Sequence, residues 1–155
     1  MKKKITVIGS SNVDLVMKMS RLPEKGETIT DADFFQEYGG KGANQAVAAA
    51  RAGGNVVFVN CVGDDAYTQR MVQNYTDDGI DTSYVFQEKG IPSGHAFVMI
   101  GDAGNNYLSV APGANYRLTP EKLQEAMPAI SNSDIILLQY EIPEETIKEI
   151  INIAT

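Results

Sequence analysis

The sequence is short of cysteine and histidine, and this shortage excludes whole classes of site. Among 155 residues there is one cysteine and one histidine. A disulfide within the chain is impossible, and a zinc site of the usual Cys/His kind cannot be assembled from one residue of each. Cys61 lies in an apolar run and is expected to be a buried, inert thiol, whereas His95 is expected to have a structural or surface role. The predicted location is a reducing cytoplasm.

Basic residues are also scarce. The chain has 13 Lys and Arg against 20 Asp and Glu, which gives a formal net charge of −7. Binding of nucleic acid depends on clustered Lys and Arg, so no nucleic-acid partner is expected. The one basic cluster, Lys2-Lys3-Lys4, precedes an apolar run that is too short for a signal peptide or a membrane span. No membrane partner is expected either.

The length predicts about one domain, and apolar runs alternate with helical patterns along it. Buried strands are predicted at 5–8, 56–62 and 135–139, and helices at about 42–52, 66–76, 120–127 and 144–154. This alternation indicates an α/β fold with a parallel sheet covered on both faces. More polar strands at about 14–19, 27–38, 95–100 and 107–110 do not fit that sheet, and they are expected to form a separate lid. The chain ends inside an amphipathic helix, so we expect half of a larger fold.

A glycine-rich segment at 39–54 is the strongest indication of a small-molecule site. Its glycines allow backbone to approach a ligand closely, and Asn44 falls in the first turn of the helix that follows. Asn12 and Asp14 follow the first strand, and Glu141 follows the strand at 135–139. Ligands of open α/β sheets bind at the carboxyl ends of the strands, where these side chains are expected. Two carboxylates, two amides and the N–H groups of residues 40–42 suit a neutral polyol such as a sugar.

Each of these residues also has a simpler explanation. Asn12 and Asp14 could be turn residues, Asn44 could bond its own backbone, and Glu141 could be a surface charge near a helix N-terminus. The sequence does not match two common nucleotide-binding motifs. Gly40-Lys41-Gly42 lacks the spacing of a phosphate loop, and the glycines after the first strand do not match the dinucleotide fingerprint. The pairs Asp64-Asp65 and Asp77-Asp78 are better explained by helix capping and a solvated turn than by a metal site.

Several motifs together resemble one family. They are Gly9-Ser10-Ser11-Asn12-Val13-Asp14, the Gly-Glu-Thr of 26–28, Gly39-Gly40-Lys41-Gly42-Ala43-Asn44-Gln45-Ala46, Gly63-Asp64-Asp65, and Gln139-Tyr140-Glu141-Ile142-Pro143. In this order they resemble ribokinases, which belong to the phosphofructokinase-B family of carbohydrate kinases. The resemblance covers the whole chain, residues 1–155. It implies a doubly wound, Rossmann-like α/β domain with a small β-sheet lid.

The resemblance also implies an activity, a site and partners. The reaction would be ATP-dependent phosphorylation of D-ribose at its 5-hydroxyl, with Mg²⁺ and a monovalent cation such as K⁺, in a homodimer that forms through the lid. Ala96 and Val110 would lie over the sugar and exclude water. The residues implied to line the ribose site are Asn12, Asp14, Gly40, Lys41, Gly42, Ala43, Asn44 and Glu141.

The 155 residues depart from the family in one respect. Ribokinases are about twice as long, and their second half carries an Asp-Thr-x-Gly-Ala-Gly-Asp segment with the catalytic base. That segment is absent here, as are the motifs for magnesium, nucleotide and monovalent cation, so no residue is assigned as catalytic. We expect an N-terminal, sugar-binding half that is inactive alone. The alternatives are another sugar or nucleoside kinase of the family, and a non-catalytic sugar-binding or interaction module.

Overall fold

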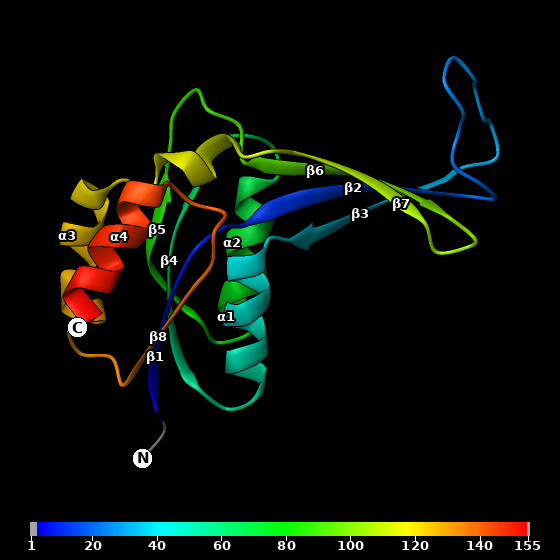
Figure 1. Ribbon diagram of the computed structural model, residues 1–155. Coiled ribbons are helices and arrows are strands. Elements are labelled where there is room, and N and C mark those ends of the chain that lie inside the picture. The colour runs from blue at the N-terminus through cyan, green and yellow to red at the C-terminus, as the bar shows by residue number, and fades with distance from the viewer. Residues whose placement is uncertain (1–2, 155) are drawn as a thin grey trace.

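The computed structural model describes residues 3–154 and contains two β-sheets (Figure 1). The large sheet is entirely parallel, with the strand order β5-β4-β1-β8. Its strands are β1 (Lys4–Ile8), β4 (Asn55–Val62), β5 (Asp81–Gln87) and β8 (Ile135–Leu138). The small sheet has the order β3-β2-β6-β7. Its strands are β2 (Asn12–Met19), β3 (Asp33–Gly39), β6 (Gly94–Gly101) and β7 (Asn106–Ala111).

Helices cover both faces of the large sheet (Figure 1). Successive side chains of a strand point to opposite faces, so each buried strand contributes to two cores. Val7 and Phe58 pack with α1 (Lys41–Arg51) and α2 (Thr68–Asp77). Their neighbours Ile8 and Val59 pack with α3 (Pro120–Ile130) and α4 (Glu144–Ala154). The predicted doubly wound α/β fold with a second small sheet is therefore confirmed.

The structure differs from the predicted elements at several places. Residues 27–32 are not a strand, because Glu27 closes a loop by pairing with Arg21 and accepting a 2.9 Å hydrogen bond from the Glu24 N–H. Helix α2 begins only at Thr68, because the Asp65 carboxylate caps the preceding turn by accepting from the Tyr67 N–H at 3.0 Å. Strand β5 was not predicted at all. It is a half-exposed edge strand whose polar residues mask the periodic pattern.

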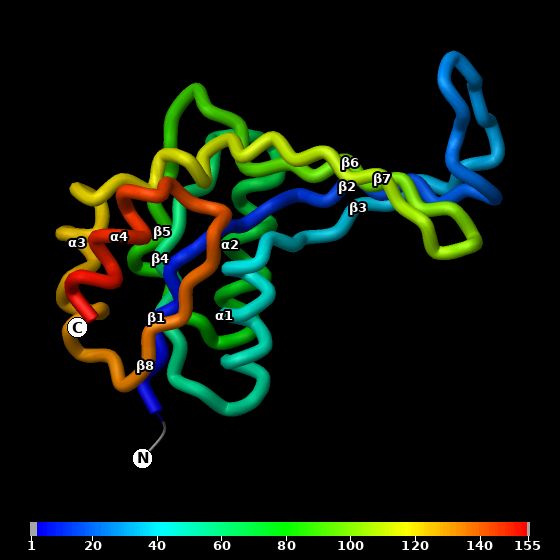
Figure 2. The backbone as a smooth tube through the Cα atoms, in the orientation of Figure 1, coloured from blue at the N-terminus to red at the C-terminus, as the bar shows by residue number. Residues whose placement is uncertain are grey.

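The chain passes between the two sheets at four places, which we call the neck: residues 9–11, Gly40, residues 88–93 and Pro112 (Figure 2). Glycines make this close packing possible. Gly40 has φ of 92°, and a Cβ there would lie 2.6 Å from the Ser11 Cα. A Cβ at Gly94 would overlap the side chains of Asn12 and Asn115. None of the helices within residues 3–154 has the length and apolarity needed to cross a bilayer.

Candidate functional site

Glu141 lies at the carboxyl end of β8 and is held by three donors. The Ser10 hydroxyl donates to its Oε2 at 2.6 Å, and the Lys41 N–H donates to the same oxygen at 3.1 Å. The Lys41 ammonium pairs with Oε1. Burial alone would raise the pKa of Glu141, but the hydrogen bonds from Lys41 and Ser10 lower it overall. The site therefore contains a fixed, ionised carboxylate.

The glycine-rich segment brings the N-terminus of α1 onto the end of β1. The Gly42 N–H donates to the Ser10 hydroxyl at 3.3 Å, and the Ala43 N–H donates to the Ser10 carbonyl at 2.8 Å. A Cβ at Gly42 would lie 2.5 Å from the Ser10 nitrogen, so only glycine fits without a shift of backbone. The amides of Lys41 and Gly42 thus organise side chains of the site itself. Their contact with a sugar stays a prediction.

Asp14 provides a buried acceptor without a partner. It is the third residue of β2, and its Oδ1 is buried with no hydrogen-bond partner in the part of the chain that the structure describes. Burial raises the pKa of Asp14, and the nearby carboxylates of Glu37 and Glu141 raise it further. Buried acceptors are normally satisfied by a donor. Asp14 is therefore ready to accept a hydrogen bond from a ligand hydroxyl.

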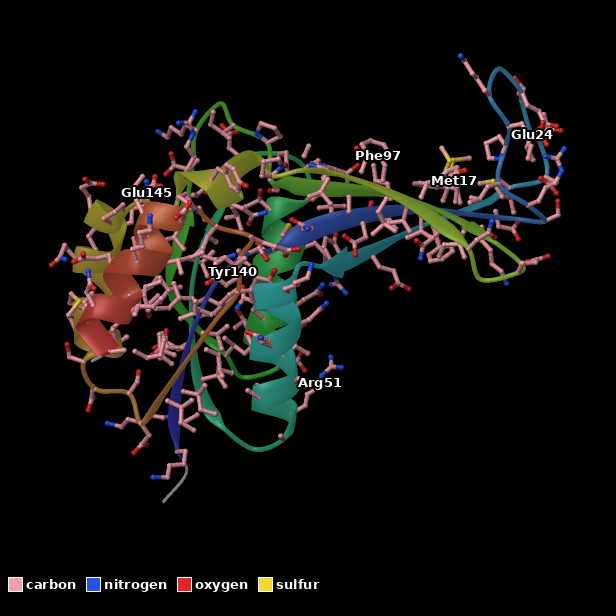
Figure 3. All side chains as sticks on the ribbon, viewed as in Figure 1. Met17, Glu24, Arg51, Phe97, Tyr140 and Glu145 are labelled. Carbon is pink, nitrogen blue, oxygen red and sulfur yellow. The ribbon has the colours of Figure 1, made fainter. Side chains whose placement is uncertain are left out.

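Asn12 lies beside Asp14 and belongs to a buried amide cluster. Its Oδ1 accepts a 2.8 Å hydrogen bond from the Asn115 Nδ2, and the Asn115 Oδ1 accepts one from the Ser11 N–H at 2.9 Å. The cluster borders a hollow of about 200 Å³. Tyr140, labelled in Figure 3, is 81% exposed at this hollow. The hollow is lined by Asn12, Val110, Pro112, Asn115, Tyr116, Tyr140 and Glu141.

Ala96 and Val110 lie in one row across the small sheet with Asp14. Asp14 pairs with Ala96, and Ala96 pairs with Val110, so the three side chains share a face. Ala96 is buried and Val110 is half exposed. This places Ala96 directly beside Asp14, with Val110 one strand further along the same face.

Asn44 does not join this group in the structure. It is an exposed residue of α1 that lines a separate hollow of about 620 Å³ with Asn74 and Asp78 of the α2 region. Its backbone N–H donates to the Gly40 carbonyl at 2.9 Å, which is an ordinary helical bond. The role of Asn44 in binding a sugar stays a prediction.

Sequence reasoning missed Ser10, Ser11 and Asn115 as parts of the site. The two serines lie inside a motif that the sequence displays, but their hydroxyls gave no separate signal. Asn115 belongs to the 3₁₀ helix η1 (Gly113–Arg117), and it lies 103 positions from Asn12. Only the tertiary fold brings them together.

The remaining candidate residues have structural roles. Burial raises the pKa of the Cys61 thiol to about 12, as expected for an inert buried cysteine. The His95 Nδ1–H donates to the Ser93 carbonyl at 2.8 Å, since a carbonyl can only accept. Asp65 caps a turn, and Asp78 forms a two-point ion pair with Arg51. Residues 3–154 contain no group of three or more His, Cys, Asp or Glu side chains placed to hold a metal.

The chain is similar to known proteins over its whole length. A family model described as pfkB family carbohydrate kinase matches residues 2–155. Ribokinase from Bacillus subtilis is 41% identical over 148 residues, which cover 96% of this chain and 50% of that protein. Deoxyribokinase from Salmonella typhi is 37% identical over 143 residues, which cover 92% of this chain and 47% of that protein.

Solved structures give the same result. Ribokinase from Arabidopsis thaliana, complexed with ribose and ATP, superposes with a TM-score of 0.84 at 33% identity and covers 100% of this chain and 52% of its own. The chain thus spans about half the length of the relatives it matches. The family model matches the chain from residue 2 to its end, and the relatives share its fold at sequence identities of 33–41%. The chain belongs to the pfkB family of carbohydrate kinases.

Proposed function

We propose that this chain forms the sugar-binding N-terminal half of a ribokinase. The complete protein would transfer the γ-phosphoryl group of ATP to the 5-hydroxyl of D-ribose. The observation that carries the proposal is the buried, unpartnered Oδ1 of Asp14, close enough to Glu141 for that carboxylate to raise its pKa. Two neighbouring carboxylates, one from β2 and one from the segment after β8, suit vicinal hydroxyls, each of which can donate to a carboxylate.

The proposed roles follow from the donors and acceptors present. Asp14 would accept from a ring hydroxyl, Asn12 would contact a neighbouring one, and Glu141, oriented by Ser10 and Lys41, would accept from a third. Ala96 and Val110 would cover the sugar and exclude water, which competes with the sugar for the phosphoryl group. The residues proposed to line the site are Asn12, Asp14, Gly40, Lys41, Gly42, Ala43, Asn44 and Glu141.

ATP, Mg²⁺ and K⁺ are proposed for the complete protein and not assigned to residues here. A relative was solved with ribose and ATP. The described residues of this chain offer no cluster of carboxylates suited to Mg²⁺. Phosphoryl transfer depends on positioning and charge stabilisation, and this chain supplies the acceptor's side alone.

A coupled assay would test the proposal on the protein expressed from its complete reading frame. We expect ATP-dependent phosphorylation of ribose, and a loss of at least about 100-fold in kcat/KM for Asp14→Ala because a buried acceptor is removed. The chain of residues 1–155 alone should show no turnover. Ordinary turnover by that short chain, or ribose phosphorylation unaffected by Asp14→Ala, would contradict the proposal.

Deoxyribose is the second candidate substrate, because one relative of similar identity is a deoxyribokinase. The two sugars differ by a single hydroxyl. Comparing kcat/KM for ribose and 2-deoxyribose in the same assay distinguishes them, and a preference for deoxyribose would replace ribose in the proposal. Nucleosides and fructose, tested in the same assay, address the other substrates of the family.

We also propose that the complete protein forms a homodimer through the small sheet. Met17, Phe34 and Tyr107 lie in one cross-strand row and are 38%, 64% and 61% exposed. Such an apolar row is unusual on the surface of a monomer. Sedimentation equilibrium should give a dimer for the parent protein and a monomer for a Phe34→Ser, Tyr107→Ser variant. A monomeric parent at micromolar concentration would refute this part.

A further inference from the structure

Asn115 occupies a buried position between two parts of the site. It is 2% exposed in η1, and its side chain uses both ends of its amide. The Oδ1 accepts from the Ser11 N–H at 2.9 Å, and the Nδ2 donates to the Asn12 Oδ1 at 2.8 Å. Gly94 leaves room for this pair, because a Cβ there would overlap both amides.

These two bonds fix the orientation of the Asn12 amide. A backbone N–H can only donate, so the Asn115 atom facing Ser11 must be its oxygen. The other end of Asn115 is then an NH₂ group, and the Asn12 atom facing it must be an oxygen. Asn12 is left with its Nδ2 for the ligand. We propose that Asn115 is a positioning residue that makes Asn12 a hydrogen-bond donor to the sugar.

The consequence is selectivity between sugar hydroxyls. An Asn12 held as a donor recognises a hydroxyl through its oxygen, whereas Asp14 and Glu141 can only accept from hydroxyls. Together they require one hydroxyl that accepts beside others that donate. The supporting layer continues below the site, because the Asn60 Nδ2 donates to the Ser11 hydroxyl at 2.7 Å. This inference rests on the proposed sugar site, and it concerns how that site discriminates.

The substitution Asn115→Asp tests it with little change in shape. The ionised carboxylate that replaces the amide still accepts from the Ser11 N–H, but it presents an oxygen to the Asn12 Oδ1. Asn12 must then turn over or move. In the protein from the complete reading frame at pH 7.5, we expect the Kd for ribose to rise about tenfold or more, because one oriented hydrogen bond from Asn12 to the sugar is lost.

A series of mono-deoxyriboses separates positioning from general damage. In the parent protein, removing the hydroxyl that Asn12 contacts should weaken binding about tenfold. In the Asn115→Asp variant, that analogue alone should bind almost as well as ribose, because the contact between Asn12 and this hydroxyl is already broken. A uniform loss across all analogues, or no change in affinity for ribose, would overturn the proposal.

Thr146→Val is the matched control. Thr146 is fully buried, and its hydroxyl donates to the Leu118 carbonyl at 2.6 Å, next to η1 but away from Asn12. It should lower the melting temperature about as much as Asn115→Asp and leave the pattern of deoxyribose affinities unchanged. If it altered that pattern too, the effect of Asn115→Asp would be one of stability, and the proposal would fail.

One readout does not depend on ribose. In ¹⁵N-labelled parent protein without sugar, the side-chain NH₂ of Asn115 should exchange slowly with solvent, and the NH₂ of Asn12 should exchange faster. The reverse order would overturn the proposed orientation. If the parent protein binds no ribose but shows the expected order, the sugar proposal fails while the amide orientation stands.

Discussion

The backbone at the heart of the site comes together because certain residues carry no side chain. Gly42 is the clearest case, since its Cα lies against the backbone of Ser10 and places the first amides of α1 on the end of β1. Helix propensity alone would favour alanine at this position by about 1 kcal/mol. The close approach to backbone therefore decides the residue type.

We predict that Gly42→Ala lowers the free energy of unfolding by about 2 kcal/mol, because the new methyl group must displace backbone rather than a flexible side chain. Denaturant titration measures the change. Gly104→Ala serves as the control, since nothing lies within 4 Å of a Cβ there and only its φ of +82° is strained. The control should lose about 1 kcal/mol. An equal or smaller loss at Gly42 would mean that α1 shifts freely.

Asp14 should show a conflict between binding and stability. Its pKa is raised in the folded protein, so the fold prefers the protonated carboxyl. This favourable contribution is complete below pH 3.8, the unfolded value, and is lost as the pH rises through the folded pKa.

Asp14→Asn removes that unfavourable charge at neutral pH. We predict that it stabilises the fold at pH 7 by about 0.5 kcal/mol, a value kept small by solvent screening. The gain should vanish below about pH 3.8, and ribose binding should be lost at every pH. Thermal unfolding across a pH series gives the first two results. Asp33→Asn, on the exposed edge of the same sheet, should change neither property.

Only some residues of the candidate site could be predicted from the sequence, because the others depend on contacts between residues far apart in the chain. Asn12, Asp14 and Glu141 follow strand-like runs, so a general rule about strand ends was sufficient to propose them. Asn115 carries no local signal, because its partners Ser11 and Asn12 lie more than 100 positions away. Asn44 was predicted at the same sheet edge, yet its exposed place on α1 depends on how the helix is rotated.

At the level of elements, α3 contains an internal irregularity. Pro128 lies inside this helix, three residues before its C-cap Ser131. A proline has no N–H to donate to the carbonyl four residues earlier, and its ring crowds that carbonyl. The sequence prediction ended the helix at about Met127, whereas the structure continues it to Ile130, which is 2% exposed and packs in the core beside the large sheet. Packing of an apolar face thus outweighs local propensity.

Replacing this proline should stabilise the protein. Pro128→Ala restores the missing N–H, and we predict a gain of about 1 kcal/mol in the free energy of unfolding. The control is Pro120→Ala at the first position of the same helix, where no bond is missing and a small loss of up to about 1 kcal/mol is expected. Urea unfolding of both variants measures the difference. A loss at position 128 would show that the proline ring itself fills a needed space.

For the whole molecule, the large sheet has two edge strands among residues 3–154, β5 and β8, and β8 is the one considered for association. Strand β8 pairs with β1 alone, and Ile135 on β8 is 44% exposed. Unpaired strand edges with apolar side chains are templates for association. The relatives are about twice as long as this chain, so they have further residues with which to cover such an edge.

We predict that residues 1–155, expressed alone, self-associate through β8. Ile135→Lys should reduce association at least about fivefold in sedimentation velocity, because a charge at the edge opposes strand pairing. Ile151→Lys, the same substitution at a side chain 45% exposed on α4, should not reduce it. If the two variants behave alike, association occurs by general apolar contact.

The neck has a mechanical consequence for the whole molecule. After β1 the chain leaves the large sheet through Ser10 and Ser11, and β2 of the small sheet begins at Asn12. A ligand at Asn12 would therefore lie where the two sheets meet. Strand β2 has eight residues and extends about 26 Å from that point. A rotation of only about 10° at the neck would therefore move the far end of the small sheet by about 4–5 Å. The proposed sugar site lies at the base of this arm, so a small adjustment around one ligand hydroxyl would become a large displacement at the far end of the small sheet.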